Sequence, residues 1–174
     1  KLRGPMLSEL AFRAQLVIRE QRELFDYWRA CAASRGMPSR SRINPAEIPA
    51  LLPGISILDA GKSPDEIIYR LAGTRLRDIF GQEVTGKSVF DLEFGEKRNY
   101  WLAVYRKVIE ERVPMQGAIK GPVADRDHVV LFWMRLPLSD DDSTVNKVLC
   151  HDVTLPVSIA YELDGVSSSK KNAG

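Results

Sequence analysis

The chain has 174 residues, which is long enough for one domain with a substantial core and too short for two comfortable ones. Its apolar fraction of 44% and charged fraction of 28% are typical of a soluble globular protein. The net charge of +2 argues against a strongly electrostatic nucleic-acid binder, for which a clustered basic face is expected.

The sequence also argues against a membrane protein and against a disulfide-stabilised secreted protein. It has no run of about 18 apolar residues that could span a bilayer. Charged residues interrupt residues 7–24, so this stretch lacks the pattern of a signal peptide. The two cysteines, Cys31 and Cys150, make no disulfide framework. We therefore expect reduced cysteines and a cytoplasmic protein.

Residues 8–34 contain no Pro or Gly and predict one long helix of about seven turns, within an amino-terminal unit of residues 8–36 that Gly36 ends. Residues 1–7 are expected to be disordered or left over from cloning. Apolar side chains recur at spacings of three and four residues, so the helix either covers its own sheet or pairs with a second copy. The candidate dimer-interface residues are Leu10, Val17, Leu24 and Trp28.

Prolines keep residues 37–54 from forming a long helix. Asn44 followed by Pro45 predicts a single capped turn, with Asn44 as the N-cap. We interpret a small basic cluster in this region as solvated surface. The cluster consists of Arg35, Arg40 and Arg42.

Strands and helices are predicted in turn along the following residues. Residues 55–60 and 66–72 are expected to form a hairpin, and residues 74–79 a short helical turn bounded by glycines. A longer helix over residues 96–112 is predicted from apolar side chains at three and four spacing. Three more strands are predicted at residues 115–120, 128–138 and 145–153.

The longest predicted strand, residues 128–138, is apolar on both faces and therefore needs two covers. The helix of residues 96–112 with the short helices can supply one cover, and the amino-terminal helix the other. This order predicts an α+β domain over residues 37–156, with a five-stranded antiparallel sheet, short helices on one face and a long N-terminal helix. Residues 157–174 are expected to be a largely disordered tail.

Several spaced motifs carry a family resemblance over roughly residues 24–152. They are Pro-Ser-Arg at 38–40, Leu-Leu-Pro at 51–53, Tyr-Arg-Leu-Ala-Gly-Thr at 69–74, Phe-Gly at 80–81 and Thr-Gly-Lys-Ser at 85–88. In this order they resemble the small PAS-type sensor domains common in alphaproteobacteria. The resemblance implies that residues 69–92 form short helices that wall a ligand pocket.

The candidate pocket is lined by side chains from strands and helices that face one another. Arg70 and Arg75 are the best candidates to meet an acidic ligand group, although a surface ion pair is the default interpretation. Aromatic side chains fill a core more often than they contact a ligand, so a filled core is the alternative. The apolar candidates are Tyr69, Leu71, Ile79, Phe80, Phe90, Trp101, Tyr105, Met115, Trp133 and Leu149.

The resemblance argues against flavin and haem as cofactors. Light-sensing members that bind flavin share an Asn-Cys-Arg-Phe box, which this sequence lacks. Haem-binding members usually supply a histidine from the longer helix, and residues 96–112 contain none. The resemblance therefore implies a small-metabolite pocket or no ligand at all.

Residues 81–88 match in full the sequence motif of a phosphate-binding loop, in which two glycines five positions apart are followed by lysine and serine. A true loop of this kind follows a buried strand and opens a long helix. Residues 74–80 are a poor buried strand, residues 90–95 make no long helix, and the charge of Glu83 would oppose a phosphate. We therefore predict no nucleotide hydrolysis.

Metal ligands and catalytic groups are few. Cys150 and Asp152 point to one face of the last strand and His151 to the other, which we interpret as a core cysteine and a surface histidine. No zinc-type spacing is present. Asp91 and His151 are the only loose candidates for a titratable catalytic pair.

These observations predict a non-catalytic, PAS-like sensory or adaptor domain. We expect it to bind a small metabolite and to signal through a homodimer or a partner protein, with neither nucleic acid nor membrane as partner. A change in the pocket would alter the pairing or angle of the amino-terminal helix. The alternatives are a small NTF2-like enzyme or ligand-binding protein, and a purely structural interaction module.

Overall fold

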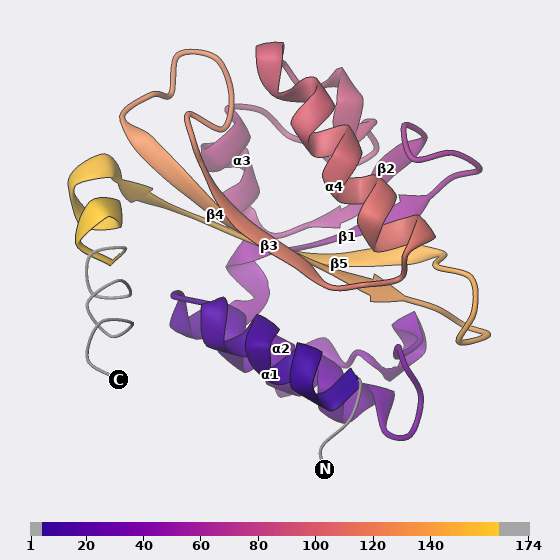
Figure 1. Cartoon of the computed structure of the whole chain (residues 1–174). Helices are drawn as coiled ribbons and strands as arrows, with labels where there is room; N and C mark the ends of the chain where they lie inside the picture. The colour runs from indigo at the N-terminus through magenta and orange to yellow at the C-terminus, as the bar shows by residue number, and fades with distance from the viewer. Residues whose placement is uncertain (1–4, 164–174) are drawn as a thin grey trace.

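Five antiparallel strands form one sheet in the computed structural model, which describes residues 5–163 (Figure 1). The strand order across the sheet is β2-β1-β5-β4-β3, so the last strand of the chain lies in the centre. The α+β fold and the five-stranded sheet predicted from the sequence are thus confirmed. The strands are β1 (Ile55–Ala60), β2 (Ile67–Ala72), β3 (Met115–Lys120), β4 (Val129–Leu138) and β5 (Lys147–Pro156).

The strand bounds agree closely with the sequence pattern, and the largest difference lies at β5. It begins at Lys147 and continues to Pro156, beyond the predicted end at residue 153. The extension follows from pairing, because Thr154 and Leu155 lie opposite Leu131 and Val130 of β4. Each residue of β4 therefore has a partner on β5, and these two long strands form the middle of the domain.

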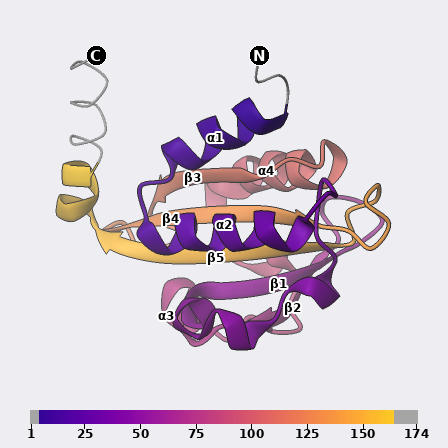
Figure 2. The same ribbon diagram turned by 90° about the horizontal axis from the view of Figure 1, so that it is seen from below.

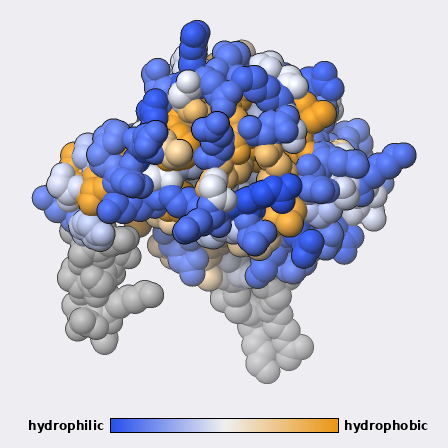
Figure 3. Space-filling model, turned by 90° about the horizontal axis from the view of Figure 1, so that it is seen from above, coloured by the Kyte–Doolittle hydropathy of each residue, from blue (hydrophilic) through white to orange (hydrophobic). Residues whose placement is uncertain are grey.

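One face of the sheet, which we call the inner face, is covered by α3 (Thr74–Phe80) and α4 (Arg98–Glu110) (Figure 1). The short turns η4 (Val89–Asp91) and η5 (Gly95–Lys97) lie between them in the sequence. Four side chains of α4 at three and four spacing are buried, as its apolar pattern predicts. The surface above this layer is mostly hydrophilic, with small hydrophobic patches (Figure 3).

The opposite face, which we call the outer face, is covered by α2 (Arg19–Ala32), which lies along β4 and β5 (Figure 2). Its buried residue Gln21 donates from Nε2 to the Phe132 carbonyl at 3.1 Å. Trp28, 2% exposed, donates from Nε1 to the Pro137 carbonyl at 2.9 Å. The eight residues 131–138 of β4 are all buried, so the prediction of a strand with two covers is confirmed.

The single amino-terminal helix predicted for residues 8–34 is two helices in the structure. The first, α1 (Pro5–Gln15), is separated from α2 by three residues that are not helical. Leu16 is buried there, and its carbonyl accepts a hydrogen bond from Arg22 Nη1 at 2.7 Å. The break lets α1 turn back onto α2, where the Phe12 and Phe25 rings lie 4.9 Å apart. Tertiary packing ends this helix, since the sequence offers no Gly or Pro there.

The second helix also ends earlier than Gly36, where the sequence predicts its end. Ala33 follows α2 with a φ of 55°, and its N–H donates to the Ala30 carbonyl. The N–H groups of Gly36 and Met37 then donate to the Asp142 carboxylate at 3.1 and 3.0 Å. The loop between β4 and β5 therefore fixes the chain after the helix.

Three short 3₁₀ helices connect α2 to the sheet: η1 (Arg40–Arg42), η2 (Pro45–Glu47) and η3 (Pro49–Gly54). The predicted capped turn is confirmed in η2, where Asn44 Oδ1 accepts from the Ala46 N–H at 3.1 Å. The prolines restrict this segment to short turns, and the turns lie along the outer face beside β1.

The chain ends are described in part. Residues 5–7 belong to α1 and residues 157–163 are helical, so the expected disorder does not extend to these residues. Residues 1–4 and 164–174 lie outside the described residues. Within residues 5–163 no helix is long and apolar enough to cross a membrane.

Replacing Trp28 with Ala tests the cover that α2 gives to the outer face. We expect the free energy of unfolding to fall by about 3–5 kcal/mol, because the change empties a buried site and leaves the Pro137 carbonyl unpaired. Urea denaturation measures the difference. Leu10→Ala is the matched control, since Leu10 is 54% exposed on α1 and its loss should change stability by about 0.5 kcal/mol or less. Equal effects of the two changes would contradict the described position of α2.

Candidate functional site

A buried ion pair lies on the inner face between the two longest strands. Arg135 of β4 and Asp152 of β5 are joined by two hydrogen bonds, Nη2 to Oδ1 at 3.0 Å and Nη1 to Oδ2 at 3.2 Å. Their side chains are 2% and 0% exposed. Arg135 Nε also donates to the Tyr105 hydroxyl of α4 at 3.0 Å. The pair thus connects two strands to the helix that covers them.

The electrostatics of this cluster favour a fixed charge pair over proton transfer. Burial opposes the charged form of Arg135, but the Asp152 carboxylate together with Tyr105, Cys150 and Tyr69 outweighs it and raises the arginine pKa well above its ordinary value. Burial raises the pKa of both Tyr69 and Tyr105, so their hydroxyls stay protonated. Burial also raises the pKa of the Cys150 thiol to about 12, which leaves it a poor nucleophile at neutral pH.

Aromatic rings enclose the guanidinium of Arg135. Its Cζ lies 5.1 Å from the Trp101 ring centre and 5.8 Å from those of Tyr105 and Trp133. The Trp101 and Trp133 rings are themselves 5.2 Å apart. A Cβ at Gly117 of β3 would come within 2.6 Å of the Trp133 ring, so only glycine leaves room for that ring. The space between these rings is filled by their own contacts.

A second polar cluster joins three elements at the outer face, and we call it the Glu20 latch. Glu20 of α2 contacts Arg75 of α3 (Oε2 to Nη1, 3.1 Å) and His151 of β5 (Oε2 to Nε2, 3.0 Å). His151 is fully buried, so its interpretation as a surface histidine is wrong. Strand alternation correctly assigns it to the face opposite Cys150, but α2 covers that face.

Burial and charge act in opposite directions within the Glu20 latch. Burial disfavours protonated His151, and this effect outweighs the carboxylates of Asp152 and Glu20, so the histidine pKa lies below its ordinary value. Burial would raise the pKa of Glu20, but Arg75 and His151 outweigh it and lower that pKa. At neutral pH the latch therefore consists of a carboxylate, a guanidinium and a neutral imidazole that can donate to the carboxylate.

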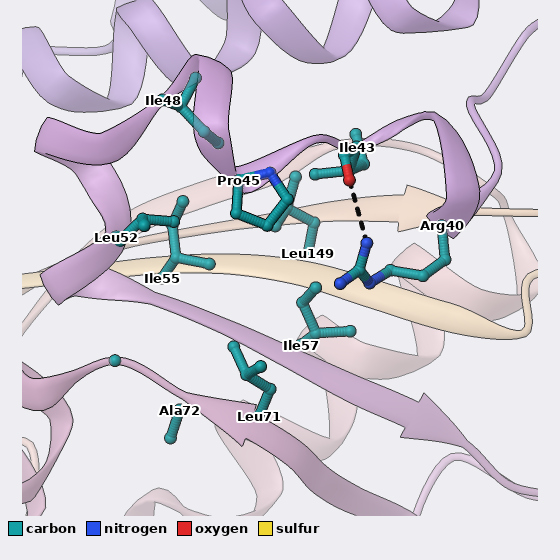
Figure 4. A pocket seen from close by; sticks show the side chains of 11 residues that line it. Arg40, Ile43, Pro45, Ile48, Leu52, Ile55, Ile57, Leu71, Ala72 and Leu149 are labelled. Carbon is teal, nitrogen blue, oxygen red and sulfur yellow. Dashed lines mark hydrogen bonds between the residues drawn. The ribbon is translucent and has the colours of Figure 1, made fainter.

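A cavity of about 250 Å³ lies on the outer face beneath the three 3₁₀ helices (Figure 4). Its floor is formed by side chains of β1 and β5, and its roof by residues of η1 to η3 and the turns between them. Gly73, which lines one end, has its N–H on the Ile55 carbonyl at 2.7 Å, and a Cβ there would lie 2.2 Å from the Leu52 carbonyl oxygen. The lining consists of Arg40, Ile43, Pro45, Ile48, Leu52, Ile55, Ile57, Leu71, Ala72, Gly73 and Leu149.

The structure divides the apolar pocket candidates between the two faces. Leu71 and Leu149 line the outer cavity rather than the inner layer. A bulge in the β1–β2 pairing explains the position of Leu71, because Tyr69 lies opposite Leu58 while Leu71 lies opposite Ile57. Leu149 of β5 is also paired with Ile57, which lines the same cavity. The sequence pattern, with its period of two, cannot reveal that bulge. The candidates in the inner layer are Tyr69, Ile79, Phe80, Phe90, Trp101, Tyr105, Met115 and Trp133.

The two candidate arginines both form ion pairs. Arg70 Nε donates to Asp59 Oδ2 at 2.7 Å, and its side chain is 70% exposed. Arg75 belongs to the Glu20 latch. The default interpretation of the sequence, a surface ion pair, therefore describes Arg70, whereas the pair of Arg75 is partly buried.

The candidate dimer residues differ in exposure. Leu24 and Trp28 are buried under α2 against the protein's own sheet, Val17 is half-buried between the helices, and Leu10 is exposed on α1. The sequence leaves open whether the amino-terminal helix covers its own sheet or pairs with a second copy, and in the structure α2 covers its own sheet.

The segment that matches the phosphate-binding motif does not have the neighbouring elements of a phosphate-binding loop. Residues 81–88 follow the helix α3 instead of a strand, and the three-residue turn η4 comes after them. Lys87 Nζ donates to Gln82 Oε1 at 2.6 Å, and Glu83 accepts from the Thr85 hydroxyl. The prediction that the strand and long helix of a phosphate loop are missing is therefore confirmed for this part of the chain.

The loose catalytic candidates do not form a pair. Asp91 is exposed in η4, beside the edge strand β2, whereas His151 is buried in the central strand under α2. Among residues 5–163 no group of three or more histidine, cysteine or acidic side chains could hold a metal ion.

Sequence analysis missed the residues that carry most of the polar organisation. Arg135 lies inside a long apolar strand, and a buried charge needs a buried partner. Its position in the sequence could therefore have predicted a buried ion pair. Glu20 gave no such signal, because its partner His151 comes from a distant part of the chain. Arg40 gave none either, because its surroundings combine the 3₁₀ helices with strands of the sheet.

Comparison with known proteins gives a consistent result. The model of a protein family described as a PAS domain matches residues 17–151. A search of curated proteins found no significant match.

Three solved structures are similar in fold. A light-oxygen-voltage domain studied with a flavin analogue has a TM-score of 0.54 at 15% identity, covering 72% of this chain and 93% of that one. The Rhodobacter sphaeroides LOV protein has a TM-score of 0.51 at 15% identity, with 65% and 67% covered. The light-state LOV domain of the blue-light photoreceptor Aureochrome1 has a TM-score of 0.50 at 14% identity, with 70% and 96% covered.

Substitution of the inner ion pair tests its structural role. We expect Arg135→Leu to lower the free energy of unfolding by about 3–5 kcal/mol, because Asp152 is left as an unpaired buried charge. The double change Arg135→Leu with Asp152→Leu should cost less than the single one, as measured by urea denaturation. Arg70→Leu is the control, because its pair is exposed and worth about 1 kcal/mol or less. A double variant less stable than Arg135→Leu would contradict this account.

The buried His151 predicts a pH dependence of stability. Its pKa is lowered below 6.5 in the folded protein, so the unfolded chain binds the proton more readily below that pH. Stability is therefore full above about pH 6.5 and falls as the pH decreases through the window below it. Denaturation between pH 7 and pH 5 should show a shallower loss for His151→Gln than for the wild type. A slope for His151→Gln equal to that of the wild type would contradict the assignment.

Proposed function

The chain belongs to the PAS domain family, and on that premise we propose that it is a non-catalytic sensory domain whose output passes through α1 and α2. PAS domains are in general signal-sensing modules. The finer parts of the proposal are a small-molecule signal, a route from the sheet to α2, and a second copy or a partner protein that receives the output.

The observation that supports the route is the Glu20 latch. Glu20 lies on the helix that covers the outer face and contacts Arg75, whose helix α3 covers the inner face. Leu76, Ile79 and Phe80 of α3 are buried in the inner layer. A shift of α3 in response to the inner layer therefore moves Arg75 relative to Glu20 and changes how firmly α2 is held.

The inner layer offers a contact for a polar atom. Trp101 Nε1 is buried and has no hydrogen-bond partner among the described residues. A buried donor without a hydrogen-bond partner costs about 1–3 kcal/mol, so an acceptor atom that reaches the Trp101 N–H would be bound favourably. We propose that a small metabolite acts on this layer and displaces its rings rather than entering a ready-made large space.

Flavin does not fit the inner layer. One fold neighbour is described with a flavin analogue, but this sequence lacks the Asn-Cys-Arg-Phe box. Trp101, Tyr105 and Trp133 lie in contact around Arg135 on the inner face, where a planar ring system would have to displace them. We therefore propose that this domain senses something other than light through flavin.

The output surface that we propose is the exposed side of α1. Its Leu10 is 54% exposed, and α1 is attached to α2 by two ion pairs, Arg13 with Asp26 and Glu9 with Arg29. Pairs that are at least partly exposed contribute little to stability, and the contact between the Phe12 and Phe25 rings also holds α1 on α2, so α1 follows α2 when that helix moves. A change in α2 would thus alter what α1 presents to a second copy or a partner.

Hydrogen exchange in α2 tests the route through the latch. We expect Glu20→Gln to lower the protection of α2 amides, because the carboxylate that holds both Arg75 and His151 is lost. Ile79→Val, a small change in the inner layer, should also lower α2 protection in the wild type but not in the Glu20→Gln background. Glu23→Gln is the matched control, since Glu23 contacts only Arg19 of the same helix among the ion pairs of residues 5–163.

Two outcomes would count against the proposal. Unchanged α2 protection in Glu20→Gln, or additive effects of Ile79→Val and Glu20→Gln, would remove the route. Sedimentation at increasing concentration separates the two receivers of the output, because a strict monomer at high micromolar concentration would leave only a partner protein.

A further inference from the structure

The segment that carries the first family motifs also builds the roof of the outer cavity. Arg40, Ile43, Pro45 and Leu52, from the stretch between Pro38 and Pro53, all line it. The sequence pattern predicts that the basic cluster in this stretch is solvated surface. Arg40 instead is only partly exposed and points along the cavity toward the Ile43 carbonyl (Figure 4).

Hydrocarbon covers nearly the whole of the cavity wall. Ile55, Ile57 and Leu149 form the floor and are 3%, 4% and 0% exposed in the complete fold. Leu71, which is 47% exposed, marks the side open to solvent. A wall of this kind favours an apolar body and offers almost no hydrogen bonds to water.

Arg40 is the single charged side chain among the eleven lining residues. Its Nη1 donates to the Ile43 carbonyl at 3.0 Å, which uses one of the five N–H groups of a guanidinium. No ion pair within residues 5–163 includes Arg40. Asp59, two residues beyond Ile57 on the same strand, is already bound by Arg70 and Lys147.

We infer that this cavity binds a small organic carboxylate with a hydrocarbon body. The carboxylate would pair with Arg40, whose fork of donors matches two carboxylate oxygens, and the body would lie over Ile57 and Leu149. A phosphate is a poorer match, because it carries more charge and no lysine or histidine stands in the wall to share it.

The cavity sets the size of the occupant. Its volume of about 250 Å³ exceeds the roughly 150 Å³ at which an apolar cavity in a protein accepts benzene. It lies just below the range of about 300–1,000 Å³ found for drug-sized ligands. A medium-chain fatty acid or an arylalkanoic acid has the appropriate length and polarity.

The cavity is also connected to the proposed output. Residues 33–39 join α2 directly to its roof, so an occupant that moves the roof moves the end of α2. This second step rests on the proposed sensory function, whereas binding of the carboxylate does not.

Titration of the whole chain with octanoate, followed calorimetrically, tests the site. We expect saturable binding with one site per chain, and a loss of affinity of about tenfold to a hundredfold in Arg40→Gln. Arg42→Gln is the matched control, because Arg42 lies in the same 3₁₀ helix but outside the cavity wall. Leu71→Glu provides a second variant that leaves Arg40 in place, and its negative charge at the open side should also weaken binding, whereas Leu71→Gln should weaken it less.

A neutral probe and a short probe test separately the charge and the hydrocarbon body of the ligand. Octanamide should bind at least tenfold more weakly than octanoate, and acetate should not bind measurably, because each lacks one of the two parts that the cavity recognises. Equal binding of octanoate and octanamide, equal effects of Arg40→Gln and Arg42→Gln, or no binding at all would overturn the inference. A dimer that buries the cavity and excludes octanoate would overturn it as well.

Hydrogen exchange separates this inference from the proposed function. If octanoate binds through Arg40 but leaves α2 protection unchanged, the carboxylate site stands and its link to the output fails. If octanoate does not bind while Glu20→Gln still loosens α2, the site fails and the route through the latch stands.

Discussion

The burial of β4 and β5 on both faces is the constraint on which the rest of this structure depends. Residues 131–138 are entirely buried, and this is possible only because α4 covers one side and α2 the other. An antiparallel sheet can leave one face in water, but the side chains of these strands do not allow it. Helix α2 is therefore part of the fold. If α2 left the sheet, Leu24, Trp28 and the apolar side chains beneath them would be exposed to water.

Two buried polar clusters follow from this double cover. On the inner face the charge of Arg135 is balanced by Asp152 and enclosed by aromatic rings. On the outer face Glu20 reaches from α2 to His151 and Arg75. The first cluster joins strands to α4 and is fully enclosed, which suits a rigid core. In the second cluster His151 is buried, whereas Glu20 and Arg75 are partly exposed and the three residues belong to separate elements. That partial exposure suits a contact that can open.

Much of the fold could be predicted because its signals are local. The sequence pattern predicted both ends of β1 correctly, and the Asn44-Pro45 cap identified η2. The features that escaped prediction depend on contacts between distant residues. The break at residues 16–18 has no Gly or Pro to mark it, and the bulge that sends Leu71 to the outer face has no signature in a period-two pattern. The contact of His151 with Glu20 likewise joins residues 131 positions apart, and the cavity wall that includes Arg40 is completed by strands β1, β2 and β5.

The account depends most directly on the state of one imidazole, that of His151, since its burial requires α2 to be docked on the sheet. A nitrogen-detected NMR titration of the side chain measures this state. The account predicts that His151 titrates below the ordinary pKa of 6.5 and that its Nε2 signal shifts in Glu20→Gln. A histidine that titrates at its ordinary value and ignores Glu20 would mean that the ring is solvated, and the outer cover described here would be contradicted.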